Sequence, residues 1–259
     1  MVVDRKKIAL ELLKAEKERK AIPPLTKKYP NITVDDAYAI QLEQVSHKLT
    51  LNHKVVGKKI GLTSKAMQDL FGVNEPDYGH LFDNMFEIDG SEIYLSELLQ
   101  PKIEFEIAFH LKKDLQGPHI TALDVIQATE YITPAFEIID SRIKDWKIRF
   151  EDTVADNGSS AKVVLGQRAI RIQDVDITNI GMVVYRNGKI LDTASSAAVM
   201  GNPALAIAWL ANSLYKYGIS LKKDEIILSG ALTKAVEIHA GDEFTAEFSQ
   251  LGSVSVSFI

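Results

Sequence analysis

The chain has 259 residues, of which 46% are hydrophobic and 25% charged, with a net charge of −5 and no cysteine. This length suits one large domain or two small ones, and the composition is that of an ordinary globular protein. The absence of cysteine excludes disulfides, cysteine nucleophiles and thiolate zinc sites, and the lack of a basic stripe argues against a nucleic-acid partner.

The N-terminal residues predict two helices. Residues 5–20 form an amphipathic pattern that ends at Pro23-Pro24. The apolar side chains of this pattern are Ile8, Leu12, Leu13 and Ala15. A second helix is expected to begin after the N-cap residue Thr33 and to continue to about Leu49. Its apolar side chains are Ala37, Tyr38, Ile40 and Val45.

The rest of the chain predicts mainly strands. A strand over 54–60 leads through a turn to a short helix near Ser64, and later strands are expected at 102–111, 131–139, 162–166, 181–186, 189–194, 225–229, 243–249 and 253–258. Asn187-Gly188 predicts a hairpin. One helix interrupts these strands, with Asn202 as cap, Pro203 in its first turn and Gly218 at its end. We expect one α+β domain over residues 1–259, with a helical section over 1–50 and a β-rich core over 51–259.

Targeting signals are absent from the sequence pattern. The first twenty residues carry charges throughout and lack the apolar segment of a signal peptide. No apolar run was found near the roughly 20 residues that a membrane-spanning helix needs. We therefore expect a cytoplasmic protein that has no membrane partner.

An acidic strand is the first chemical feature. In residues 102–111 the apolar side chains alternate with polar ones, so Glu104 and Glu106 share one face. Two carboxylates on one strand face can converge on a cation, although a solvated polar face would show the same pattern.

Glu137 adds a third carboxylate. It lies in a strand that is apolar on both faces, so we expect it to be buried and to need a partner. That partner is either Arg142 in a salt bridge or a metal ion. Three carboxylates without cysteine or clustered histidine suit a hard cation such as Mg²⁺ or Mn²⁺.

The turn over residues 57–64 is a candidate anion site. Thr63 or Ser64 can cap the helix that follows, and its first N–H groups could then bind a carboxylate; an ordinary helix cap is the alternative. Lys58 and Lys59 point to opposite faces of the strand, so one of them is expected to face a site. Asp77 is a general base or a residue that stabilises a turn. Residues 152–160 predict a polar loop that contacts a ligand or only connects elements.

Other catalytic motifs are missing. The six histidines are scattered, and the chain has no GxSxG, GxGxxG or P-loop motif. Serine-hydrolase and nucleotide-dependent activities are therefore disfavoured.

Nine stretches in order resemble the 2-oxo-4-pentenoate (2-hydroxypenta-2,4-dienoate) hydratase and 4-oxalocrotonate decarboxylase family, within the fumarylacetoacetate hydrolase superfamily. Each is weak alone, but together they cover nearly the whole chain. They are DDAYAIQ (35–41), VVGKKIGLTSKAMQ (55–68), GVNEPDYGHLFDNM (72–85), PKIEFEIAF (101–109), PAFEIIDSRIKDW (134–146), DTVADNGSS (152–160), AWLANSL (208–214), ILSGAL (227–232) and LGSVSVSFI (251–259).

The resemblance implies a mixed β-sandwich roll with helices, bound Mg²⁺ or Mn²⁺, and a homo-oligomer. It places the metal ligands at Glu104, Glu106 and Glu137, and the catalytic residues at Lys59 and Asp77. Leu62, Thr63 and Ser64 match the stretch that holds the substrate carboxylate, and Ser160 matches a small polar position near the ligand.

The activity so implied is hydration of a small unsaturated 2-oxo acid during meta-cleavage degradation of aromatic compounds. Water adds at C4 of 2-hydroxypenta-2,4-dienoate after tautomerisation and gives 4-hydroxy-2-oxopentanoate. We expect Asp77 and Lys59 to transfer protons while a metal stabilises charge on the C2 oxygen.

Three alternatives remain open. The chain could be a 4-oxalocrotonate decarboxylase, but the PDYG turn with Asp77 favours a hydratase. It could hydrate 2-oxohept-3-enedioate, although its segment after Ser141-Arg142 is compact. In a different class, it could be a structural subunit that pairs with a sister decarboxylase or hydratase. The complete acidic triad with Lys59 and Asp77 argues against that last role.

Overall fold

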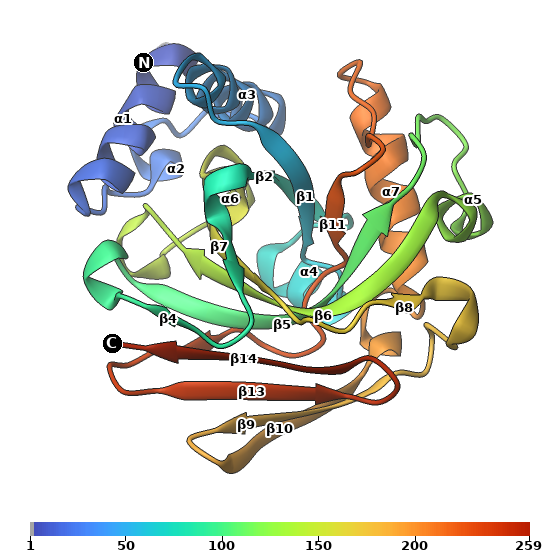
Figure 1. Cartoon of the computed structure of the whole chain (residues 1–259). Helices are drawn as coiled ribbons and strands as arrows, with labels where there is room; N and C mark the ends of the chain where they lie inside the picture. The colour runs from blue at the N-terminus through green and yellow to red at the C-terminus, as the bar shows by residue number, and fades with distance from the viewer. Residues whose placement is uncertain (1–2) are drawn as a thin grey trace.

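The computed structural model describes residues 3–259, apart from the side chain of Leu70. Its N-terminal section contains α1 (Arg5–Glu18), α2 (Leu25–Lys28) and α3 (Val34–Thr50). The Thr33 side chain accepts a hydrogen bond from the Asp36 N–H, and the Asp36 carboxylate accepts one from the Thr33 N–H. This reciprocal cap confirms the predicted start of α3. Helices α1 and α3 pack together beside the sheets (Figure 1).

The larger sheet is curled and has nine strands (Figure 1). Its main order is β2-β1-β11-β5-β6-β7-β3, while β12 pairs with β5 and β8 pairs with β6. The pairs β1–β11 and β3–β7 are parallel and the others antiparallel. The strands are β1 (Val55–Gly61), β2 (Asp77–Phe82), β3 (Phe86–Ile88), β5 (Pro101–Leu111), β6 (Thr129–Asp140), β7 (Ser160–Leu165), β8 (Ile170–Arg171), β11 (Ile226–Leu228) and β12 (Val236–Glu237).

The smaller sheet has five strands in the order β10-β9-β13-β14-β4. They are β4 (Ser91–Ile93), β9 (Gly181–Arg186), β10 (Lys189–Ser195), β13 (Glu243–Phe248) and β14 (Gly252–Phe258). Asn187 and Gly188 both have positive φ, 53° and 72°, which confirms the predicted β9–β10 hairpin. The two sheets share a core in which the rings of Phe105 and Phe244 lie 6.3 Å apart.

Four further helices are α4 (Lys65–Phe71), α5 (Ala122–Ala128), α6 (Phe150–Ala155) and α7 (Pro203–Tyr215). Short 3₁₀ turns occur at Asp83–Met85, Leu95–Glu97, Lys144–Trp146, Asn157–Ser159, Ile172–Asp174 and Ser196–Ala198. The Asn202 side chain accepts a hydrogen bond from the Ala204 N–H, which confirms the predicted cap of α7. The expectation of a single helix among the strands was wrong, because α5 and α6 are also present. Both are short, so their apolar pattern is weak.

Two local predictions need correction. Asp77 begins β2 and pairs with Gly61, so it does not lie in a turn. Residues 152–160 form part of α6 and a buried turn that leads into β7, and so are not simply a loop. Their polar side chains find partners inside the protein, such as Thr26 for Asp152 and Arg142 for Asp156, so polar composition did not indicate exposure here.

The segment Ser196–Tyr215 is long and apolar enough to cross a membrane by length and composition, so the expectation that no such run exists was also wrong. Within this segment, 50% of an apolar stretch of 18 residues is buried inside the fold. Helix α7 packs against α5 and β1. A core helix of a globular protein has the same signature, so this feature alone assigns no membrane contact.

Candidate metal centre and active site

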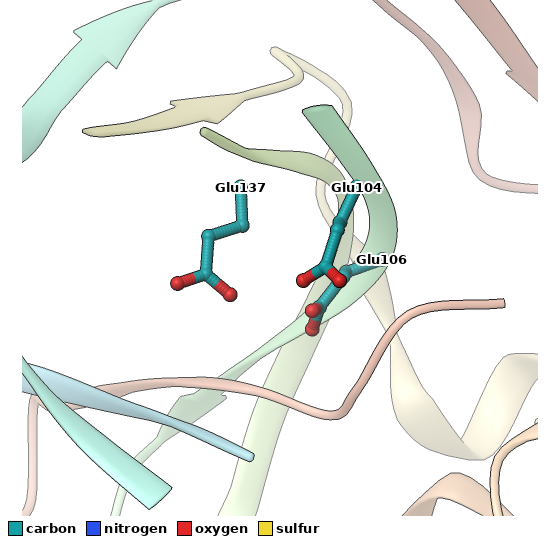
Figure 2. Close-up of side chains that lie close together, drawn as sticks. All are labelled: Glu104, Glu106 and Glu137. Carbon is teal, nitrogen blue, oxygen red and sulfur yellow. The ribbon is translucent and has the colours of Figure 1, made fainter. Parts of the chain in front are cut away.

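Three carboxylates meet between β5 and β6. Glu104 and Glu106 project from one face of β5, and Glu137 lies directly opposite Glu104 in the β5–β6 register. One oxygen from each carboxylate lies within 4.8 Å of the others. Figure 2 shows the three groups converging. The structure therefore brings together all three predicted metal ligands.

These carboxylates are electrostatically strained against one another. Burial, with Glu137 adding repulsion, raises the pKa of Glu104 to about 7, although Lys59 opposes the shift. Burial and repulsion from Glu137 and Glu104 raise the pKa of Glu106 well above its ordinary value. Burial also raises the pKa of Glu137 against the pull of Lys59. A bound cation would relieve this repulsion.

The hydrogen bonds of the cluster leave ligand atoms free. Glu106 Oε2 accepts the Gly230 N–H at 2.7 Å. Among residues 3–259, Glu106 Oε1 accepts no hydrogen bond, and Glu137 Oε2 accepts none but faces the Lys59 ammonium at 3.2 Å. Orphaned carboxylate oxygens in a buried site suit a hard, oxygen-preferring cation. The residues present therefore fit Mg²⁺ or Mn²⁺.

Glu137 is paired with Lys59 and not with Arg142, so the alternative partner considered for it was wrong. Lys59 Nζ lies 3.2 Å from Glu137 Oε2. Arg142 instead forms an ion pair with Asp156 at 2.6 Å. The reason is topological, because β1 belongs to the same curled sheet as β5 and β6, separated from β5 by β11, while Arg142 follows the end of β6.

The two neighbouring lysines of β1 have separate roles, as the strand alternation predicted. Lys58 forms a buried ion pair with Glu225 at 2.7 Å, whereas Lys59 faces the acidic cluster. Burial alone would lower the pKa of Lys59, but Glu137, Glu104 and Asp77 together raise it above its ordinary value. Lys59 is therefore held as a charged ammonium group.

Asp77 lies on the neighbouring strand β2 and lines the same cavity as Lys59. Its carboxylate is buried, and Oδ1 accepts no hydrogen bond among the described residues. Burial raises the pKa of Asp77, and the Lys59 charge opposes that shift. A carboxylate with a raised pKa beside a fixed ammonium group is a suitable pair for proton transfer.

The predicted carboxylate-binding turn is compact. Leu62 has a positive φ of 56°, and the Ser64 side chain accepts a hydrogen bond from the Met67 N–H at the start of α4. Thr63 is buried and packs against Gly230, where a Cβ would lie 2.5 Å from Thr63 Oγ1. Ser64 is therefore the cap, and Thr63 is held in place from the β11 side.

A cavity of about 820 Å³ opens onto these groups. Lys59, Leu62, Asp77 and Glu104 line it, while Glu106, Glu137, Thr63, Ser64 and Ser160 are absent from its wall. Ser160 does not line the cavity but donates a hydrogen bond to Glu137 Oε1 at 2.7 Å.

Residues that the sequence analysis did not single out complete the wall of the cavity. They include Phe71, Lys102, Trp146 and Arg149, whereas Thr153, Gly158 and Ser159 of the wall belong to the segment 152–160 that was a candidate for ligand contact. Lys102 could have been found, since it precedes Glu104 by two residues on the same strand face. No sequence signal placed Trp146 or Arg149 there.

Comparison with known proteins identifies the family. Residues 63–258 match the model of the fumarylacetoacetate (FAA) hydrolase C-terminal family. The chain belongs to the fumarylacetoacetate hydrolase family. The expected resemblance is thus confirmed, and the matched region contains Asp77 and the three glutamates but begins after Lys59 and Leu62.

Several known enzymes are similar to this chain along most of its length. A 2-hydroxypent-2,4-dienoate hydratase from Pseudomonas putida is 48% identical, over 81% of this chain and 95% of its own. A 2-oxo-hept-4-ene-1,7-dioate hydratase from Escherichia coli is 43% identical, over 97% of each chain. The solved 4-oxalocrotonate decarboxylase from Pseudomonas putida G7, complexed with magnesium and adipate, superposes with a TM-score of 0.97 at 36% identity, covering 100% of this chain and 99% of that one.

Proposed function

We propose that this chain is a metal-dependent hydro-lyase that adds water to 2-hydroxypenta-2,4-dienoate and forms 4-hydroxy-2-oxopentanoate in meta-cleavage degradation of aromatic compounds. The observation that carries the proposal is that Asp77, Lys59 and Glu104 line one cavity and that Glu104 forms a cluster with Glu106 and Glu137. The similarity to a 2-hydroxypent-2,4-dienoate hydratase supports the choice of substrate.

Glu104, Glu106 and Glu137 would hold Mg²⁺ or Mn²⁺. The unsatisfied Oε1 of Glu106 and the mutual repulsion of the carboxylates support this assignment. A bound cation would supply Lewis-acid stabilisation of the negative charge that develops on the C2 oxygen of the substrate. The Ser160 hydroxyl, by donating to Glu137 Oε1, would fix the orientation of that carboxylate.

Lys59 and Asp77 would divide the proton transfers. Because its acidic neighbours keep Lys59 charged, it serves as a proton donor and as a positive charge beside the enolate. Asp77 serves as the base that accepts a proton from the water that adds to C4. The dienol first becomes the conjugated enone by losing its 2-hydroxyl proton and gaining a proton at C5. The water oxygen then bonds to C4, its proton goes to Asp77, and Lys59 delivers a proton to C3. Transfer of the proton from Asp77 to Lys59 restores both residues, so the net change is the gain of one water.

The Leu62-Thr63-Ser64 turn would hold the substrate carboxylate. Leu62 lines the cavity, and the Ser64 cap fixes the direction of the backbone N–H groups at the start of α4. The positive charge of Lys59 on the adjoining strand adds to the attraction for an anion.

The whole chain would act as one catalytic domain, with the section 1–50 packed against the core and not forming a separate unit. Packing of α3 on α6 supports this assignment. We also propose a cytoplasmic homo-oligomer, in keeping with the resemblance, and leave a complex with a sister decarboxylase or hydratase as a further possibility to be tested by co-purification.

The deciding experiment is turnover with Mg²⁺ on fresh 2-hydroxypenta-2,4-dienoate and, separately, on 4-oxalocrotonate and 2-oxohept-3-enedioate, with products identified by NMR. We expect 4-hydroxy-2-oxopentanoate from the first and no CO₂ from the second. Release of CO₂ from 4-oxalocrotonate without hydration of the pentadienoate would instead assign the decarboxylase activity, which the 0.97 TM-score to that enzyme makes the main rival. Preferred hydration of the diacid would change the substrate assignment. Metal binding without turnover on any of the three would support a structural subunit.

A further inference from the structure

The turn between α6 and β7 has an unusual backbone. Asn157, Gly158 and Ser159 all have positive φ, at 55°, 59° and 56°. Residues with a Cβ rarely adopt this conformation, so Asn157 and Ser159, on either side of the glycine, keep it only when their surroundings hold them. All three residues are buried. The turn Asp156–Ser160 is therefore held by its contacts and not by its own preference.

The Arg142 side chain donates hydrogen bonds to both ends of this turn. Its Nε donates to Asp156 Oδ1 at 2.6 Å, and its Nη2 donates to the Asp156 carbonyl. Nη1 donates to the Ser160 carbonyl at 3.0 Å and to the Asp140 carbonyl at 2.8 Å. The planar guanidinium group can satisfy these acceptors at once, whereas a lysine ammonium cannot.

Asp156 closes the same network from the turn. Its Oδ2 accepts the Arg142 backbone N–H at 3.0 Å and the hydroxyls of Ser141 and Ser159, each at 3.1 Å. Arg142 and Asp156 are both buried. A buried ion pair adds little net stability compared with apolar residues, so stability alone is a weak reason for this one.

The turn contacts Lys59 and Glu137 in the acidic centre. A Cβ at Gly158 would lie 3.0 Å from Lys59 Cε, so the turn forms a wall along the lysine side chain. Ser160, at the end of the turn, donates to Glu137 Oε1 at 2.7 Å. Asn157 bonds both backbone groups of His80 on β2, at 2.8 and 2.9 Å. The turn thus spans β1, β2 and β6 at the site.

We propose that Arg142 and Asp156 are a positioning pair that sets the Lys59 ammonium and the Glu137 carboxylate by holding the turn Asp156–Ser160. Arg142 does not line the cavity, so it acts through the turn and not on the substrate. The activity arm of its test rests on the proposed hydratase function, whereas the metal-binding arm does not.

The control is another Arg–Asp pair, which lies at the smaller sheet and does not line the cavity. Arg186 on β9 of the smaller sheet donates from Nε to Asp242 Oδ1 at 2.9 Å, with Nη2 on the second oxygen. Arg142→Lys and Arg186→Lys therefore remove the same kind of interaction at two places. Each variant is characterised by its melting temperature, by kcat and KM, and by Mn²⁺ affinity from electron paramagnetic resonance titration.

We expect Arg142→Lys to lower kcat about 10- to 100-fold and to weaken Mn²⁺ binding by a similar order, as loss of groups that orient a metal ligand generally does. Arg186→Lys should change both by less than about twofold, the size expected of a change remote from the reacting groups. Equal effects of the two variants at equal loss of melting temperature would overturn the proposal, because Arg142 would then be merely structural.

Two further measurements cover a poorly folded Arg142→Lys. Asp156→Asn keeps the size of the side chain but removes its charge, and should show the same paired loss of kcat and Mn²⁺ affinity. In Arg142→Ala, millimolar ethylguanidinium should restore at least about a tenth of the lost kcat by filling the vacated position. Absence of both effects would contradict the proposal. If the wild-type chain binds Mn²⁺ but turns over no substrate, only the hydratase assignment is wrong. If it binds no Mn²⁺, the hydratase assignment and the positioning proposal are both wrong.

Discussion

Gly61 leaves the space that the Asp77 carboxylate occupies. The two residues face each other across the β1–β2 pair, and a Cβ built on Gly61 would lie 2.1 Å from Asp77 Oδ1. Glycine at this position therefore lets the buried carboxylate reach the cavity beside Lys59.

Gly61→Ala should push the Asp77 carboxylate away from its position while leaving it ionisable. We expect kcat to fall on the order of 10²-fold, because displacement of a catalytic group by about 1 Å costs that much. Gly181→Ala on β9 is the control, since the added Cβ would lie 3.7 Å from its nearest neighbour, Ser249 Oγ, which is an ordinary contact. Comparable turnover in the two variants would show that the Gly61–Asp77 fit is unimportant.

Asp77→Asn tests the assignment of the base directly. The amide keeps the shape of the side chain but cannot accept the proton, so we expect kcat to fall by about 10²–10⁴-fold. Asp77 does not belong to the acidic cluster, so Mn²⁺ affinity measured by calorimetry should stay within a few-fold of wild type. A large loss of Mn²⁺ affinity would mean that Asp77 serves the metal centre instead.

Glu106→Gln separates stability from metal binding. Because burial and the neighbouring carboxylates raise the pKa of Glu106, a neutral amide should be tolerated there, and the Gly230 N–H keeps an acceptor. The melting temperature in EDTA should not fall below that of wild type. Wild type should gain about 2.7 kcal/mol of unfolding free energy when Mg²⁺ is present at 100 times its Kd, and the variant should gain almost nothing at that concentration. Equal metal stabilisation of both proteins would remove Glu106 from the ligand set.

Removal of the buried His80 should flatten the acid side of the stability profile. Burial, with Lys58 adding repulsion, lowers the pKa of His80 to about 3. Its Nδ1 lies 3.0 Å from Gln41 Oε1, which fits a neutral ring that donates to the amide oxygen. Because the unfolded chain takes up a proton near pH 6.5 and the folded one does not, stability is lost as the pH falls from about 6.5 toward 3.

His80→Asn keeps a donor near the Nδ1 position but does not titrate. Urea unfolding at pH 7 and pH 5 should show that wild type loses about 2 kcal/mol more than the variant over this interval. The comparison within each protein cancels any general destabilisation by the substitution. If the two proteins lose the same unfolding free energy, His80 is not the group that resists protonation.

Local sequence patterns determined the positions of several helix caps, turns and strand faces. The alternation over residues 102–111 put Glu104 and Glu106 on one face because successive side chains in a strand point in opposite directions. The same rule separated Lys58 from Lys59. Two helix caps were predicted at Thr33 and Asn202, because each side chain accepts a hydrogen bond from a free backbone N–H of the first helical turn. The hairpin was predicted at Asn187-Gly188, because these residues tolerate positive φ. Lys59 and Asp77 were selected by resemblance to the family and not by pattern.

The tertiary structure alone decided which groups are partners. The β5–β6 register set Glu137 opposite Glu104, and the position of β1 in the sheet gave Glu137 the Lys59 ammonium in place of Arg142. Residues 152–160 read as a polar loop because short-range composition cannot reveal that Asp156 has a buried guanidinium partner. Such pairings depend on which segments the fold brings into contact. A buried charge is stable wherever a distant partner satisfies it, and sequence spacing carries no record of that distance.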